Sequence, residues 1–413
     1  MLEKRDRDRI QSISDNLYKA SRRVKILRHL NWPDSVRHQF FRSGSEKLPQ
    51  IEYLNFDSED TLILLKKTSK VMGDTPFDNW LKIKLNDILV SIDLLNHTGE
   101  KEFHNISSKI YGLPTGLLRD GETTPLDLAN KFISVIETYN NNPLIKPKRK
   151  NIKVVELRQL MENRVKEIFG KHSPDILIMD GMSAKATATS KYIKLRKGAS
   201  FTQKDVDQLI NHEALVHVAT TLNGRAQDEM KILGGNYGAV TKTQEGLAVF
   251  SEFITGSIDV ERMYRITDRV IAIQMAIEGA SFIDIYRFFL ERNSLKADAF
   301  ENARRVFRGG VLTGGAPFTK DIVYLDGLVR VHNFFRTVVA KGRQDILKLL
   351  FSGKITLEDI PMLMRLKKEK LIKTPKFLPY WIEDMDYLVC YFSFSVFMDD
   401  INYQNVEDYY KYL

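Results

Sequence analysis

The stretch Asn-His-Glu-Ala-Leu-Val-His at residues 211–217 places a histidine on either side of a glutamate. A second stretch, Gln-Glu-Gly-Leu-Ala at residues 244–248, supplies another carboxylate further along the chain. Helical periodicity surrounds both, so each is expected to lie on a helix. Two imidazoles and a carboxylate, with a second carboxylate beside the first imidazole, are the parts of a catalytic zinc site. The two stretches therefore indicate metal-assisted hydrolysis, with a peptide bond as the expected substrate.

The spacing of His212 and His217 is unusual for two ligands on one helix. Five residues at ~100° each would place the two side chains ~140° apart on a regular α-helix, where they would diverge. A local wide turn would return them to one face, and π-type turns occur mostly at functional sites. We therefore predict a π-type distortion of the helix between His212 and His217.

The neighbouring acidic residues have separate expected roles. Glu213 follows the first histidine directly, which suits a general base acting on water at the metal. Glu245 is the expected third ligand, and Glu252 lies on the same helical face, from which it could orient a histidine. Simpler interpretations stay open. The two histidines could form an ordinary polar contact. Glu245 could be a helix N-terminal charge that interacts with the helix dipole, and Glu252 could be a plain surface or ion-pair glutamate.

Composition narrows the class of protein. The 413 residues allow two or three domains, and 43% hydrophobic with 28% charged residues is ordinary for a soluble fold. A single cysteine, Cys390, excludes a disulfide framework and a cysteine-based zinc site. The charged start of the chain has no apolar core of a signal peptide, so a cytoplasmic location is expected. The apolar stretch 387–398 is too short to span a bilayer and is predicted to be a buried helix.

The net charge of +9 does not by itself indicate nucleic-acid binding. A nucleic-acid binder is expected to gather its basic residues on one face. Here the basic runs are scattered, at 146–150 in an expected linker and at 365–373 on the expected solvated face of a helix. We expect neither a nucleic-acid nor a membrane partner, while an acidic peptide substrate would suit the charge.

The order of elements predicts an α+β protein that is mostly helical. Residues 1–145 form an expected helical N-terminal region, 151–345 the catalytic domain, and 346–413 a helical C-terminal region packing on that domain. Two short strand-like runs, 175–179 and 192–195, precede the histidine-bearing helix. This layout is common in zinc peptidases, in which an edge strand binds the extended substrate.

The motifs together resemble one family. The similarity is to the HExxxH zinc metallopeptidases, which include the microtubule-associated tyrosine carboxypeptidase of animals and bacterial proteins labelled flavohaemoglobin expression-modulating QEGLA motif proteins. It rests on residues 211–217, 221–224 and 243–248, and it extends to Tyr111-Gly112-Leu113-Pro114, Arg308-Gly309-Gly310 and Phe318-Thr319-Lys320-Asp321, so it covers most of the chain.

The resemblance implies a zincin-like catalytic domain with a small sheet and two metal-binding helices. It implies one Zn²⁺ per chain, held by His212, His217 and Glu245, with Glu213 catalytic. It also implies carboxypeptidase-like activity on a peptide or protein C-terminus. The chain departs from the family pattern at 214 and 216, where Ala and Val stand in place of Gly and Thr. The departures leave ligation intact, but they do not support the same choice of substrate, so tubulin is not carried over.

Such a hydrolase also needs a donor for the developing oxyanion and a cation for the terminal carboxylate. Tyr237, in a glycine-rich loop, and Tyr324 are the candidate donors. Arg308, beside two glycines, is the first candidate cation because a guanidinium fork matches a carboxylate, and Lys320 is the second. The alternatives to a carboxypeptidase are a non-catalytic regulatory or binding protein that keeps the peptidase fold, and a zinc hydrolase acting on another amide.

Overall fold

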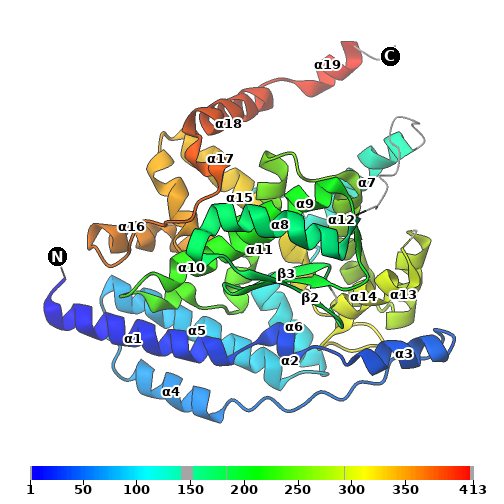
Figure 1. The fold of residues 1–413 in the computed structure, drawn as a ribbon, viewed down its shortest axis with the longest axis horizontal. Helices are drawn as coiled ribbons and strands as arrows, with labels where there is room; N and C mark the ends of the chain where they lie inside the picture. The colour runs from blue at the N-terminus through cyan, green and yellow to red at the C-terminus, as the bar shows by residue number, and fades with distance from the viewer. Residues whose placement is uncertain (1, 141–151, 183, 293, 410–413) are drawn as a thin grey trace.

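The computed structural model describes residues 2–140, 152–182, 184–292 and 294–409. The fold is α+β and mostly helical, as the sequence predicts, with a small sheet between helical regions (Figure 1). None of the helices in these ranges is long and apolar enough to cross a membrane. The expected linker with its basic run at 146–150 lies outside the described residues.

The N-terminal region is helical, as expected. Its longest helix, α5, begins at a capping box in which the Thr75 hydroxyl accepts from the Asp78 amide, and Pro76 occupies its first turn. Helices α1, α4 and α5 pack together along one side of the molecule (Figure 1). The helices of this region are α1 (Lys4–Arg23), α2 (Ile26–His29), α3 (Asp34–Arg42), α4 (Glu59–Ser69), α5 (Pro76–Asn96), α6 (Lys101–Tyr111) and α7 (Pro125–Asn140).

The sheet precedes the histidine-bearing helix, and its order is β2-β4-β3. The two predicted strands are present as β2 and β4, which pair in parallel with Ile176 opposite Ile193. A third strand, β3, pairs antiparallel with β4 and forms an edge of the sheet. The elements of this region are β1 (Ile152–Lys153), α8 (Val154–Phe169), η1 (Gly170–His172), β2 (Asp175–Met179), β3 (Ala186–Ala188), β4 (Tyr192–Arg196), β5 (Ser200–Phe201), α9 (Gln203–Leu209), η2 (Ile210–Val218) and α10 (Ala219–Arg225); β1 pairs with β5.

The remaining chain is helical and surrounds a central pair, α11 and α15. The two helices approach closely at Gly246 and Gly327, where a Cβ on Gly246 would lie 2.2 Å from the Gly327 carbonyl carbon. The elements are η3 (Lys231–Gly234), η4 (Gly238–Val240), α11 (Thr241–Ile254), α12 (Val260–Ile277), α13 (Phe282–Glu291), α14 (Lys296–Phe307), η5 (Lys320–Ile322), α15 (Val323–Ala340), η6 (Gln344–Phe351), η7 (Leu357–Asp359), α16 (Ile360–Lys368), α17 (Tyr380–Glu383), α18 (Met385–Asp399) and α19 (Tyr403–Tyr409).

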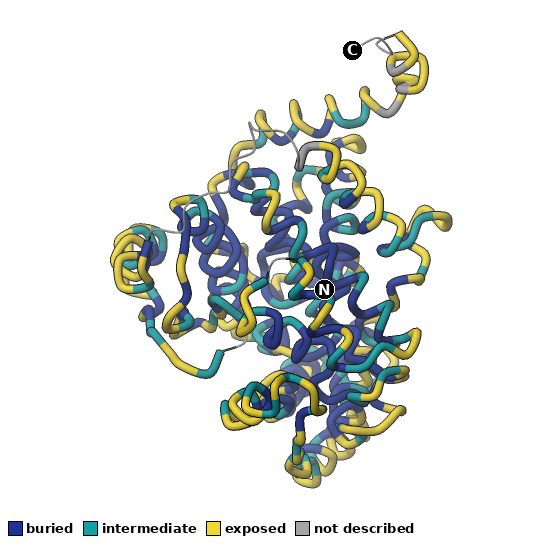
Figure 2. Tube along the Cα trace, turned by 90° about the vertical axis from the view of Figure 1, so that its right-hand side faces the viewer, coloured by how far each residue is buried: buried dark blue, intermediate teal, exposed yellow. Residues whose placement is uncertain are grey.

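Buried residues occupy the middle of the molecule (Figure 2), and many residues of α11 and α15 are among those buried. The largest apolar core joins side chains of α1 and α5 to those of α11, α15 and α18. A second core lies between α8, the sheet and the α9–η2 helix, and a third joins α3 to α12, α13 and α14. The division into three domains stays a prediction, while the largest core draws on all three of the predicted segments.

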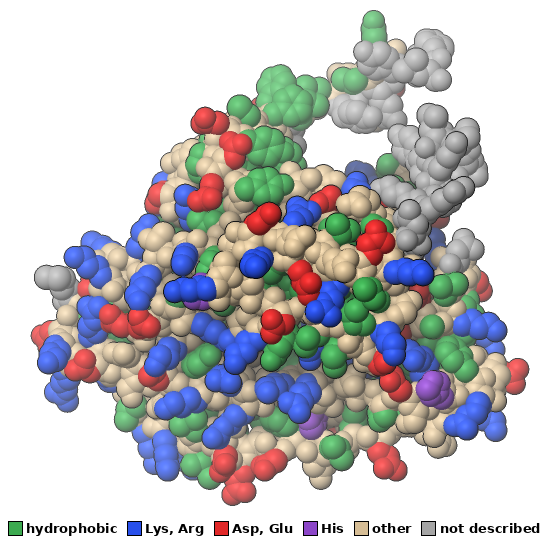
Figure 3. Space-filling model, viewed as in Figure 1, with side chains coloured by type: hydrophobic (Ala, Val, Ile, Leu, Met, Phe, Trp, Pro, Cys, Tyr) green, Lys and Arg blue, Asp and Glu red, His purple; other side chains and the backbone are tan. Residues whose placement is uncertain are grey.

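Two further expectations concern the surface. The stretch 387–398 is helical as predicted, but the prediction that it is buried is wrong for most of it: Leu388 and Phe392 are fully buried, whereas Phe394 is 63% exposed. Helices α18 and α19 extend away from the body (Figure 1). The basic side chains visible in Figure 3 are spread over the face and mixed with acidic ones, as the scattered runs predict.

Candidate functional site

The helix that carries the two histidines changes its winding as predicted. It begins as α9 at a capping box in which the Thr202 hydroxyl accepts from the Asp205 amide. From Ile210 to Val218 it is a π-helix, η2. The wide turn returns the rings of His212 and His217 to the same side, with ring centroids 4.9 Å apart. The predicted π-type distortion is therefore confirmed.

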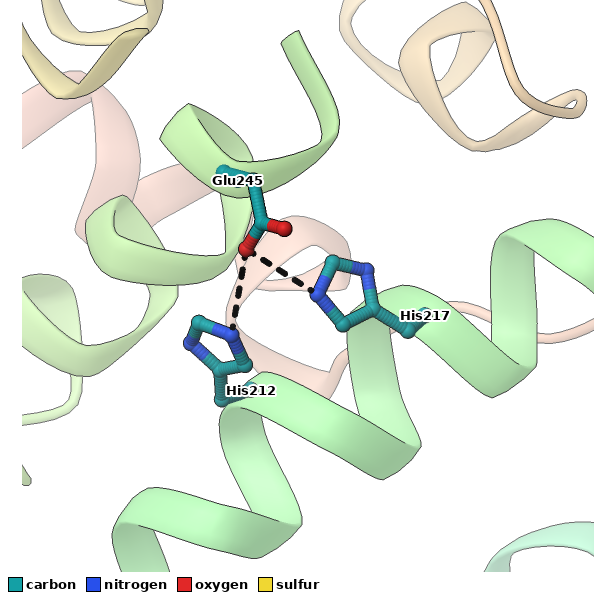
Figure 4. Close-up of side chains that lie close together, drawn as sticks. All are labelled: His212, His217 and Glu245. Atoms are coloured by element: carbon teal, nitrogen blue, oxygen red, sulfur yellow. Dashed lines mark ion pairs between the residues drawn. The ribbon is translucent and has the colours of Figure 1, made fainter. Parts of the chain in front are cut away.

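The third member of the cluster, Glu245, projects from the neighbouring helix α11. Figure 4 shows its carboxylate directed at the two imidazoles. Glu245 Oε2 lies 3.6 Å from His212 Nε2 and 3.5 Å from His217 Nε2. A hydrogen bond of 2.8 Å from the Thr220 hydroxyl to Gln244 Oε1 ties the two helices together beside the cluster. The structure thus brings together the three residues that the sequence singles out as ligands.

The cluster has the geometry and charge of a cation site. One nitrogen from each histidine and one oxygen of Glu245 lie within 4.8 Å of one another. Tetrahedral zinc with N and O ligands would require ligand atoms about 3.3 Å apart, close to the distances found. Burial alone would lower the pKa of His212, but the carboxylates of Glu245 and Glu252 raise it to about 10. The surroundings therefore favour a positive charge between these side chains.

Glu252 lies directly behind His212 and is fully buried, so the interpretation as a surface glutamate is wrong. His212 Nδ1 donates to Glu252 Oε1 at 2.6 Å. Arg262 donates to both carboxylate oxygens at 3.0 Å, and Gln208 donates to Oε2 at 3.1 Å. Burial opposes the charge on Glu252, but Arg262 and His212 lower its pKa to about 2. This anion holds the His212 ring with Nε2 directed at Glu245.

Glu213 is 7% exposed and lies on the same π-helical segment. Its Oε2 atom is buried and has no hydrogen-bond partner among the described residues. Leaving a buried carboxylate oxygen unpaired costs free energy, and folds tolerate such groups mainly where a ligand or a reaction uses them. The unpaired oxygen fits a group whose task is to accept a proton.

A group of buried cations lies on the far side of Glu245. Lys320 Nζ is 3.4 Å from Glu245 Oε1, and the Lys320 side chain is 5% exposed. Tyr324 stands beside it: its hydroxyl accepts from Arg305 at 3.2 Å, and Lys320 lies 5.3 Å from the centre of its ring. Burial opposes the charge on Glu245, yet Lys320 and the histidines hold its pKa well below its usual value. The structure therefore brings Lys320 and Tyr324 to the site.

Arg308 and Tyr237 are placed differently. Arg308 is 6% exposed, and its guanidinium lies 5.8 Å from the centre of the Phe318 ring. Burial lowers its pKa to about 10, and the carboxylate that opposes this shift is Asp321 rather than Glu213 or Glu245. Tyr237 is 3% exposed in the largest core, where burial raises its pKa. The structure does not bring these two side chains into the histidine cluster.

The sequence did not indicate three features of the site. Arg262 follows Glu252 after a turn that no local pattern reveals. Lys354 comes from a distant loop; burial lowers its pKa to about 8, against the opposing charges of Glu245 and Glu213. Strand β3, which contacts η2, lies in a short Ala-Thr-Ala run without the alternation that marks a strand.

A family model described as microtubule-associated tyrosine carboxypeptidase matches residues 38–400. Among solved structures, a protein assigned as a lipoprotein of Colwellia psychrerythraea is 13% identical with a TM-score of 0.40. The alignment covers 81% of this chain and 66% of that one, just under two thirds of its length. No curated protein matches the chain. Because the family model spans most of the sequence, the chain belongs to the microtubule-associated tyrosine carboxypeptidase family.

Proposed function

We propose that the protein is a zinc-dependent metallopeptidase that removes a residue from the C-terminus of a peptide or protein. The observation that carries the proposal is the π-helical turn, which gathers two imidazole nitrogens and a carboxylate oxygen next to an unpaired buried carboxylate. A regular helix would separate the histidines, so the fold departs from its usual winding where the ligands must converge. Membership of a carboxypeptidase family supports the C-terminal activity.

In this proposal, His212, His217 and Glu245 hold the ion. Lewis-acid polarisation of a carbonyl and acidification of water are the chemistry that zinc supplies when bound. Glu252 accepts the Nδ1 proton of His212 and so leaves the Nε2 lone pair available for the metal. Glu213 takes the proton of the attacking water and passes it to the leaving amine. Tyr324 is the candidate donor to the developing oxyanion, because its hydroxyl is hydrogen-bonded to Arg305, one of the buried cations near Glu245.

The edge strand supports a peptide as substrate. Strand β3 lies at the edge of the sheet and contacts η2, the segment that carries both histidines and Glu213. An extended peptide can add to such an edge through main-chain hydrogen bonds, which do not depend on side-chain identity. This arrangement would place a scissile bond next to the metal site.

The deciding experiment is zinc per chain by elemental analysis of the wild type, His217→Ala and His97→Ala. His97 lies at the end of α5, remote from the cluster in sequence, and serves as the matched control. We expect about one zinc in the wild type and the control and loss of zinc in His217→Ala. Mass spectrometry of peptide digests should then show release of one C-terminal residue. A wild type that stays free of zinc after reconstitution would refute the proposal.

A further inference from the structure

Helix α18 is apolar on two faces, and only one of them is covered. Leu388 and Phe392 are buried on the face that packs against the body, where α18 contacts α15. The other face is a stripe of exposed apolar side chains with alternating spacings of four and three residues, the repeat by which one helix packs on another. The stripe, which runs into the turn after α18, consists of Tyr387, Tyr391, Phe394, Met398 and Ile401. A helix that is apolar all round is normally enclosed, so a second surface is expected to cover the stripe.

The charges around the stripe are acidic. Residues 377–409 contain no lysine or arginine, although the chain as a whole has a net charge of +9. Glu383, Asp386 and Asp400 are exposed near the two ends of α18, and none of them forms an ion pair within the described ranges. Two such stripes packed on each other would bring acidic ends together, where like charges repel. The charge therefore favours a partner surface that is apolar and basic.

Helix α4 presents a surface of this kind. Its buried face, which includes Leu65, belongs to the largest core, and α4 contacts α1. The exposed side chains from its middle to the turn after it are apolar and basic, and they include Leu62, Ile63, Lys66, Lys67, Lys70 and Val71. Among the described residues these lysines have no ion-pair partner. Apolar side chains gather where α18 leaves the body (Figure 3), and α4 lies on the opposite side of the molecule (Figure 1), so a second copy must supply the contact.

The two surfaces also match along the helix axes. Eight residues separate Asp386 from Phe394, and eight separate Lys70 from Leu62. Both helices rise about 1.5 Å per residue, so in an antiparallel pair Asp386 lies beside Lys70 when Phe394 lies beside Leu62. This orientation also places the positive end of the α18 dipole at the negative end of the α4 dipole. Because α18 is the longer helix, Asp400 extends beyond the acidic first turn of α4 and does not face it.

We propose that copies of this chain associate head to tail, with the exposed stripe of α18 in one copy packed antiparallel on α4 of the next. The two surfaces differ and lie on opposite sides of the molecule, so one partner cannot occupy both. Each added copy then leaves one α18 and one α4 free, and the assembly grows past a dimer until a ring closes. The apolar contact supplies most of the free energy of association, while the acid–lysine pairs set the orientation and weaken with salt.

The test measures the mass of the full chain by light scattering or sedimentation as the protein concentration is raised. We expect the mass of the wild type to rise above that of one chain and above that of a dimer. Phe394→Ser should weaken association by about 10- to 100-fold, because it removes the most buried contact of the stripe. Asp386→Lys and Lys70→Glu should each weaken it by about 5- to 10-fold, and the double variant should recover the wild-type association. Lys101→Glu changes an exposed lysine of α6 and is the matched control, which should associate as the wild type.

Recovery in the double variant would carry the proposal, since a variant that fails to fold is not rescued by a second charge change on another helix. A wild type that stays a single chain at every concentration overturns it. A dimer that stops growing and is insensitive to Lys70→Glu also overturns it, because another face then forms the contact. If Asp386→Lys weakens association and adding Lys70→Glu restores nothing, α4 is not the partner surface and the proposal fails.

Discussion

Helices α5 and α9–η2 begin in the same way and continue differently. Each starts at a threonine capping box, Thr75 with Asp78 and Thr202 with Asp205, and in both the hydroxyl accepts from the amide at 3.2 Å. Helix α5 then remains a regular α-helix with one buried face and one exposed face. The second helix becomes a π-helix in which every residue but His217 is buried. The same start therefore leads to a structural helix in one place and to the candidate site in the other.

Both helices bury charge, but only α5 pairs it fully. Lys84 of α5 lies 2.7 Å from Asp359 Oδ1, which also accepts from Trp80 Nε1 at 2.7 Å. On η2, Glu213 Oε2 and Asn211 Oδ1 have no hydrogen-bond partner within the described ranges. Buried charge by itself is thus no sign of a site. Buried charged groups that lie close together and keep an atom without a hydrogen-bond partner are a better sign of a functional site.

The largest expected effect is a loss of kcat on changing Glu213, whose Oε2 atom has no hydrogen-bond partner among the described residues. Changing Glu213→Gln should lower kcat by about 10²- to 10⁴-fold, because an amide cannot act as the general base. Zinc content should be unchanged, and the free energy of unfolding should not fall, since Oε2 has no hydrogen bond to lose. Peptidase assays, elemental analysis and denaturant unfolding check these three points. Retained activity would remove Glu213 from the proposed mechanism.

A change at the paired residue Lys84 should have the opposite result, a loss of stability without a loss of activity. Changing Lys84→Met leaves Asp359 buried without its cation and should cost about 3–5 kcal/mol of unfolding free energy. The zinc content and the activity of the folded fraction should stay at wild-type values. Lys82→Met, on the same helix with a side chain 43% exposed, is the control and should change stability little. A loss of zinc in Lys84→Met would show that the two charged clusters are coupled.

The contrast also explains what the sequence could predict. The two longer strands and the π-helical turn follow from local rules, because each depends on residues close together in the chain. The turn is the clearest case, since a spacing of five residues from His212 to His217 fits a common ligand role only if the helix widens. The evidence for the site in the sequence was thus a histidine spacing that a regular α-helix cannot bring to one face.

Features that depend on distant contacts were missed or misplaced. Lys354 is held beside Asn236 because Gly353 packs on Leu233, a contact that no spacing in the sequence records. The sequence could place Glu252 behind a histidine, but not the Arg262 and Gln208 side chains that pair its buried charge. Helix α18 was expected to be buried because it is apolar, but composition does not show whether a partner covers a helix. The surroundings of each of these residues depend on tertiary contacts between segments far apart in the sequence.

The smallest expected effect compares the two capping boxes themselves. Thr75→Ala and Thr202→Ala each remove a hydroxyl that accepts from an amide at 3.2 Å, so each should cost about 1 kcal/mol of unfolding free energy. Activity should separate them. The first turns of α9 lead to Gln208, which donates to Glu252 behind His212, so fraying at Thr202 loosens the site. Fraying at Thr75 affects only the paired charges of α5. Denaturant unfolding gives the stability of each variant, and kcat/KM per folded molecule should fall in Thr202→Ala alone. An equal fall in Thr75→Ala would mean that the site depends on the whole core rather than on its own helix.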